Sequence, residues 1–133
     1  MVNPISTALA GLNVAQVRVG VAAQNIANAQ STGAGDTGAY RALKVTQTAG
    51  ADGGPRAEVS EKLPATVRLQ GPAYGGETLG QPVEFPNVNL AEEIVSMKLA
   101  SHSYRANIAV IDAAISLEDT LINGLARSLD QSV

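Results

Sequence analysis

Residues 90–127 read LAEEIVSMKLASHSYRANIAVIDAAISLEDTLINGLAR, a long stretch that contains no proline and a single glycine. Positions that step alternately by four and three residues carry nine apolar residues out of eleven, counting Tyr104. The eleven positions are 90, 94, 97, 101, 104, 108, 111, 115, 118, 122 and 125. This spacing predicts a helix with Asn89 as N-cap and an end near Arg127. Such a helix extends roughly 55 Å, further than a compact domain of this size covers, so another structure must cover it.

The chain begins with a second helical pattern, over residues 4–30. We expect Asn3 to cap this helix and Pro4 to take its first position, where the missing N–H costs nothing. The same 4-3 spacing gives six apolar residues out of seven: Ile5, Leu9, Leu12, Gln16, Val19, Ala23 and Ile26. Four small residues form a second stripe: Ala8, Ala15, Ala22 and Ala29. A 3.5-residue period is typical of a seam between supercoiled helices, and small residues let helices approach closely.

The first helix is nearly uncharged, because Arg18 is the only charged residue before Asp36. A solvated helix face normally carries more charge, which favours burial of this face against another structure. A low-charge surface in a small alanine-rich domain explains the same pattern. Gly11 and Gly20 each cost about 1 kcal/mol relative to alanine, so the isolated segment is expected to be mostly disordered.

The charges of the second helix lack partners within the helix. None has an opposite charge three or four residues away; they are Glu92, Glu93, Lys98, Arg105, Asp112, Glu118 and Asp119. They are therefore free to pair between subunits, although a low density of charges gives the same result by chance. Both interpretations stay open.

Residues 31–88 hold ten of the 13 glycines and five of the six prolines, so the middle of the chain is irregular. Tyr40–Gln47 and Thr66–Gln70 alternate well enough for short strands, with residues 52–55 as a turn. We predict a mainly α fold with two long terminal helices packed as an antiparallel coiled coil and a small irregular or β-hairpin middle. The segments are 1–30, 31–88 and 89–133, and 1–30 with 89–127 form one helical core; the fold of 48–82 is left open.

Composition excludes several classes of protein. The net charge is −3 and no Lys/Arg cluster is present, which argues against a nucleic-acid surface. There is no cysteine, hence no disulfide and no zinc–thiolate site. No apolar stretch is continuous enough for a secretory signal or a membrane-spanning helix, so export from the cytoplasm requires another route.

No motif predicts an enzyme, a cofactor, a metal site or a small-molecule substrate. Residues 33–38 read GAGDTG, but a dinucleotide-binding glycine motif follows a strand and opens a helix, and here the order is reversed. His102 is the only histidine, and its helical neighbours include no carboxylate to orient it. Adjacent acids such as Glu118 and Asp119 point about 100° apart and do not share a reacting centre.

The two ends together resemble the axial proteins of the bacterial flagellum, and among these the proximal rod proteins. AQVR at 15–18 and AAQNIANA at 22–29 are similar to the family's Asn-x-Ala-Asn signature. The Thr-x-Gly-Tyr that usually follows is split here by a glycine-rich insert between Thr32-Gly33 and Tyr40, as in proximal rod proteins. PNVNLAEEIVSM at 86–97 and SYRAN at 103–107 resemble the family's C-terminal motif. The match covers 1–47 and 83–125, while 51–81 lacks the family's aspartate-proline and histidine-proline elements.

The resemblance implies a structural subunit of the periplasmic rod in the flagellar basal body, which transmits motor torque to the hook. It implies export through the flagellar type III apparatus without a cleaved signal peptide. The implied partners are copies of itself, other flagellar rod proteins, the type III export apparatus and surrounding ring proteins. Another flagellar axial protein and a cytoplasmic coiled-coil adaptor are the alternatives, and an enzyme is the weakest of them.

For this role we expect the apolar residues of the two seams to pack helix against helix and subunit against subunit. These residues are Ile5, Leu9, Leu12, Val19 and Ile26 in the first helix and Ile94, Met97, Tyr104, Ile108, Ile111 and Ile115 in the second. Three asparagines are expected to satisfy buried polar contacts between helices: Asn25, Asn28 and Asn107.

Overall fold

A computed structural model of the chain describes residues 3–34, 38–51, 53–70 and 82–130. Two helices lie near the ends, α1 (Pro4–Ala27) and α2 (Leu90–Asp130). The strands between them are β1 (Gly33–Ala34), β2 (Leu43–Ala49), β3 (Pro55–Glu61), β4 (Thr66–Gln70) and β5 (Pro82–Pro86). The prediction of a mostly α fold with two helices and a small β-hairpin middle is confirmed.

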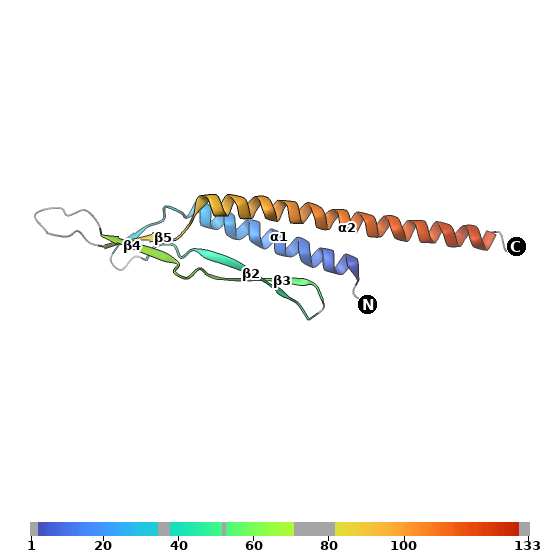
Figure 1. Cartoon of the computed structure of the whole chain (residues 1–133), viewed down its shortest axis with the longest axis horizontal. Coiled ribbons are helices and arrows are strands. Elements are labelled where there is room, and N and C mark those ends of the chain that lie inside the picture. The colour runs from blue at the N-terminus through green and yellow to red at the C-terminus, as the bar shows by residue number, and fades with distance from the viewer. Residues whose placement is uncertain (1–2, 35–37, 52, 71–81, 131–133) are drawn as a thin grey trace, which may run out of the picture.

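The helices lie side by side and run in opposite directions, as Figure 1 shows. Asn25, near the end of α1, contacts Glu93 in the first turn of α2. Gly11, near the start of α1, lies against Asn107 further along α2. In this register the first residue of α1 lies opposite about residue 114, and α2 continues alone to Asp130.

Both helices begin where their asparagine caps predict. The Asn3 Oδ1 atom accepts a hydrogen bond of 2.9 Å from the Ile5 N–H, with Pro4 at the first helical position. The Asn89 Oδ1 atom accepts from the N–H of Ala91 at 3.0 Å. Each cap satisfies a backbone donor that has no partner inside its helix. The predicted ends are less accurate, since α1 stops at Ala27 instead of Gln30 and α2 passes Arg127.

The core between the elements consists of small side chains. Seven of its nine buried apolar residues are alanines: Ala8, Val14, Ala15, Val21, Ala22, Ala39, Ala42, Ala65 and Ala100. At Gly11 the backbone of α1 lies very close to α2, because a Cβ atom there would be only 2.5 Å from the Asn107 side-chain oxygen. The alanine stripe, rather than the stripe of large residues, therefore faces the inside of the subunit.

The β strands form two small sheets. Strands β2 and β3 pair as an antiparallel hairpin whose turn is closed by a 2.7 Å hydrogen bond from the Gly50 N–H to the Gly54 oxygen. Gly53 has a φ of 81°, which glycine adopts without strain. The hairpin lies along α1, where a Cβ on Gly54 would come within 3.0 Å of the Ala10 Cβ. The other sheet has the order β1-β5-β4, and β4 spans the predicted Thr66–Gln70.

Asn25 joins three parts of the chain through four hydrogen bonds and is fully buried. Its Oδ1 atom accepts from the Tyr40 hydroxyl and the Leu43 N–H, both at 3.0 Å. Its Nδ2 atom donates to the Leu43 oxygen and to Glu93 Oε1, both at 2.8 Å. The backbone of Leu43 fixes which amide atom points where, because one end must accept and the other must donate. Burial, and then the charge of Glu93, raise the pKa of Tyr40 and keep its hydroxyl protonated as the donor.

The sequence predicts no stretch suited to a membrane-spanning helix, but by length and composition alone α1 is long enough and apolar enough to cross a membrane. The core helix of a soluble protein passes the same test. In this chain one face of α1 is packed against α2 and the hairpin, and Asn25 satisfies its amide there. We therefore interpret α1 as a helix that packs on one face within the subunit.

Asn25→Ala is expected to destabilise the fold by about 2–3 kcal/mol, because it leaves the backbone of Leu43 and the carboxylate of Glu93 without their buried partner. The matched control is Asn28→Ala, which removes only local hydrogen bonds to Gln24 and Ser31. Urea unfolding followed by circular dichroism measures both. Equal losses in the two variants would contradict the role of Asn25 as the junction.

The two glycines of α1 should respond oppositely to alanine. At Gly20 nothing lies within 4 Å of an added Cβ, so Gly20→Ala should stabilise the helix by roughly 1 kcal/mol. At Gly11 the new Cβ displaces the Asn107 amide from its 2.8 Å bond to the Ser103 oxygen, so the propensity gain should be cancelled or reversed. Thermal unfolding of both variants is the measurement, and a gain at Gly11 equal to that at Gly20 would show that the helices are not in close contact there.

Candidate assembly interface

The end of α2 extends beyond everything else in the described structure (Figure 1). Every residue from 115 to 127 is exposed. Five large apolar side chains lie on this bare end, between 48% and 65% exposed: Ile115, Leu117, Leu121, Ile122 and Leu125. The sixteen residues after 114 correspond to roughly 24 Å of helix. Such an apolar helix in water is typical of a surface that binds another chain.

A groove of about 680 Å³ lies between the two helices. Its walls are mostly apolar and come from both helices: Ala15, Gln16, Val19, Gly20, Met97, Ser101, Tyr104 and Arg105. The missing side chain of Gly20 leaves this part of α1 open. The same chain therefore carries an apolar groove and an exposed apolar helix end.

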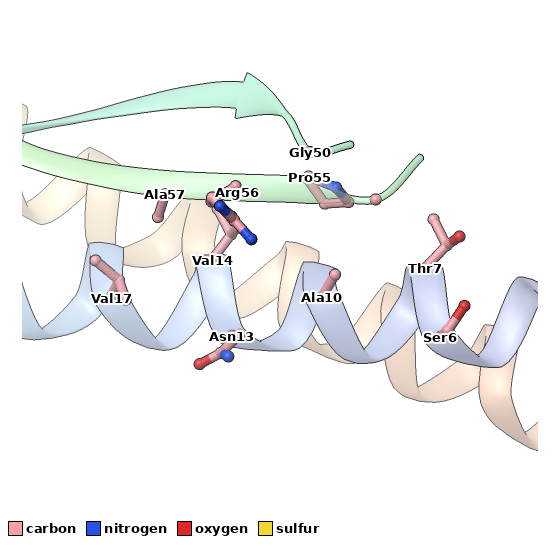
Figure 2. A pocket seen from close by; sticks show the side chains of 11 residues that line it. Ser6, Thr7, Ala10, Asn13, Val14, Val17, Gly50, Pro55, Arg56 and Ala57 are labelled. Atoms are coloured by element: carbon pink, nitrogen blue, oxygen red, sulfur yellow. The ribbon is translucent and has the colours of Figure 1, made fainter. Parts of the chain in front are cut away.

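A second groove, of about 400 Å³, separates α1 from the β2–β3 hairpin. Figure 2 shows Thr7, Ala10 and Val14 pointing from α1 toward the hairpin, with Arg56 above Val14. Hydroxyl and methyl groups dominate its walls, and no carboxylate or imidazole lines it. The groove therefore offers no pair of groups for acid–base catalysis.

No residue of the described segments forms part of a group of three or more His, Asp or Glu side chains suited to a metal ion. His102 is exposed on α2. The glycine motif at 33–38 is only partly described: Gly33 is the first residue of the short strand β1, and 35–37 lie outside the described residues.

The ion pairs lie in and beside the β region. Arg41 and Glu61 are 2.6 Å apart, Lys62 and Glu92 are 3.6 Å apart, and Arg68 contacts Glu84. The hydrogen bond from Arg41 lowers the pKa of Glu61. By contrast, several charged residues of α2 are exposed and form no ion pair within the described residues, among them Lys98, Arg105, Asp112, Glu118, Asp119 and Arg127.

The chain resembles known proteins over most of its length. Residues 81–124, which comprise β5 and most of α2, match the family described as flagellar basal body rod FlgEFG protein C-terminal. The flagellar basal-body rod protein FlgC of Salmonella typhimurium is 32% identical, over 88% of this chain and 92% of that protein. FlgC of Borreliella burgdorferi is 31% identical over 85% and 90%, and FlgC of Agrobacterium fabrum is 34% identical over 89% and 90%.

The chain belongs to the FlgC family of flagellar basal-body rod proteins. It is therefore a structural component of the rod, and its place is the flagellar basal body. The resemblance to proximal rod proteins is confirmed, because the similar proteins are all named FlgC.

The packing residues expected of this FlgC-family chain fall into two groups. Exposed residues are Leu9 at 55%, Ile94 at 49%, Ile115 at 48% and Ile108 at 39%. Half-buried residues are Ile5, Leu12, Val19, Ile26, Met97, Tyr104 and Ile111. Of the asparagines, Asn25 bridges α1 and α2, Asn28 bonds within its own turn, and Asn107 bonds the Ser103 oxygen while packing on Gly11.

Sequence reasoning missed the partners of Asn25. Tyr40 and Glu93 complete its network, but the sequence places Tyr40 only in a predicted strand and a family motif, and Glu93 only among the helix charges without a partner. The inward stripe of α1 was visible as Ala8, Ala15 and Ala22, although the larger residues beside it gave the stronger signal. On α2 the same shift brings Ala100 inside and leaves Ile94 outside.

Ending the chain after Ala114 removes the bare end of α2. Because residues 115–127 are all exposed, the unfolding free energy of the remainder should fall by less than about 1 kcal/mol. Ending it after Ile108 also removes Ile111 and Ala114, which are half-buried, and should destabilise it clearly more. Urea unfolding distinguishes the two truncations, and a large loss in the longer one would show that the bare end supports the subunit's own fold.

Proposed function

We propose that this FlgC-family subunit assembles through its terminal helices into the periplasmic rod that transmits motor torque to the hook. The observation that carries the proposal is the exposed apolar row at the end of α2, formed by Ile115, Leu117, Leu121 and Ile122. A helix of this composition is stabilised when a neighbouring subunit covers it, since each large apolar side chain contributes roughly 1.5–3 kcal/mol on full burial.

The exposed members of the predicted seams are proposed as contacts between subunits: Leu9, Ile94, Ile108 and Ile115. The half-buried members line the boundary between the helix pair and its neighbours, with supercoiled coiled-coil packing as the expected geometry. A role in scaffolding, not catalysis, agrees with the family name of the relatives. No observation favours a cytoplasmic adaptor.

The proposal includes a route and partners. The subunit is expected to leave the cytoplasm through the flagellar type III apparatus without a cleaved signal peptide. Its neighbours are expected to be copies of itself, other rod proteins and the surrounding rings. Within the subunit the core is thin and alanine-rich, so the helix pair should be marginal alone and more stable in the assembly.

The test places the gene in a host that lacks its own FlgC. Ile115→Asp with Ile122→Asp puts two carboxylates on the bare end and should abolish swimming in soft agar while leaving the chain exported. Ser116→Asp with Asn123→Asp is the matched control, since it adds the same charge at exposed polar positions one residue away.

Immunoblots of the periplasmic fraction establish that all variants are made and exported. Normal swimming by the Ile115 and Ile122 variant would contradict a subunit contact at the bare end. The wild-type gene is also expressed together with the partner genes of its own operon. If swimming is still not restored, the rod function itself is contradicted.

A further inference from the structure

Four charges of α2 lie seven residues apart along one side of the helix, and we call them the charge stripe: Lys98, Arg105, Asp112 and Asp119. Residues seven apart drift by only about 20° around a helix, so they point in nearly the same direction. The first two are cations and the last two are anions. All four are exposed and form no ion pair in the described structure.

An apolar stripe runs beside the charge stripe, four residues ahead of each charge. It consists of Ile94, Ser101, Ile108 and Ile115, and Ile122 continues it. The four isoleucines are 39% to 64% exposed. An exposed apolar row flanked by a row of charges is the arrangement of a helix that pairs with another helix.

The opposite flank of the apolar stripe is occupied by α1. Glu93 is bonded to Asn25 there, Ala100 is fully buried, and Asn107 packs on Gly11. In a parallel pair of helices, the charge stripe of one α2 would face the flank of the other α2 that α1 already covers. In an antiparallel pair, the charge stripes of the two α2 helices face each other.

We propose that two copies of this chain form a dimer through antiparallel α2 helices. A two-fold axis between Ile108 and Ala109 places Lys98 of each copy opposite Asp119 of the other, and Arg105 opposite Asp112. Because the axis repeats both contacts, all four charges of each stripe find an opposite charge. A two-fold contact uses the same patch on both copies and must be self-complementary, as this stripe is.

The groove between α1 and α2 fits this arrangement. With Lys98 opposite Asp119, the bare end of the second copy runs past Ser101 and Met97, which line the groove. Ile115 and Ile122 of the second copy then meet apolar walls, and Gly20 leaves room for them. Each copy covers the other's bare end, and a four-helix bundle results.

A two-fold contact is closed, while a helical rod joins subunits that all point the same way. The dimer therefore lies outside the rod and covers the isoleucine stripe before assembly. The inference does not rest on the proposed function, because it concerns the isolated chain, and its failure would leave the motility test unaffected.

Sedimentation equilibrium of the purified full chain measures the dimer, which should be weaker at high salt because exposed ion pairs are screened. Two charge-preserving swaps then fix the orientation. Lys98→Asp with Asp119→Lys keeps every antiparallel pair and should leave the dimer Kd unchanged. Lys98→Asp with Asp112→Lys sets like charges opposite each other at all four contacts and should raise the Kd by roughly 30-fold or more.

The matched control is Arg56→Glu with Glu58→Arg, a swap of two exposed charges on β3 away from α2, and it should have no effect on the Kd. Circular dichroism establishes that the variants keep the wild-type helicity. A wild-type chain that stays monomeric up to millimolar concentration overturns the proposal. The reverse result, in which only the Lys98 and Asp112 swap still associates, also overturns the proposal. That pattern requires parallel helices staggered by fourteen residues, which place position 98 opposite 112 and position 105 opposite 119.

Discussion

The side chain of Asn25 holds the subunit in register. Its four hydrogen bonds reach α2 through Glu93, β2 through the backbone of Leu43, and the preceding loop through Tyr40. The surrounding core is made largely of alanine, and alanines slide past one another with little change in buried area. Where hydrophobic packing specifies position so weakly, a buried and fully satisfied polar group decides which alignment of the helices is the native one.

The distribution of small and large apolar residues is the reverse of that in a typical globular protein. Small residues such as Ala15 and Ala22 fill the inside, and large ones such as Leu117 and Ile122 remain in water. An isolated chain gains little from that arrangement, because the large side chains carry most of the available hydrophobic free energy. In the proposed assembly, neighbouring subunits cover these side chains and supply that free energy. The same inversion explains why the groove between the helices is open, since Gly20 sits where a core helix would carry a larger residue.

Much of the fold was predictable from local signals. Asn3 with Pro4 and the Asn89 cap fixed the helix starts, and β4 was found within its bounds, because caps and alternation act through neighbouring residues. Strand β3 was missed, since Pro55–Glu61 is charged and largely exposed. Which stripe of α1 faces inward was also not predictable, because periodicity ranks stripes by hydrophobicity and takes no account of neighbouring subunits. The network of Asn25 depends on residues up to 68 positions apart, which no local pattern encodes.

The junction at Asn25 has a mechanical consequence. If α2 slid by one heptad, about 10 Å, Ala100 would replace Glu93 opposite Asn25, and Gly11 would no longer face Asn107. The buried amide would then lose its bond to the carboxylate, at a cost of about 1–3 kcal/mol. The contacts of Asn25 with Glu93 and of Gly11 with Asn107 therefore oppose sliding of the two helices along their axes.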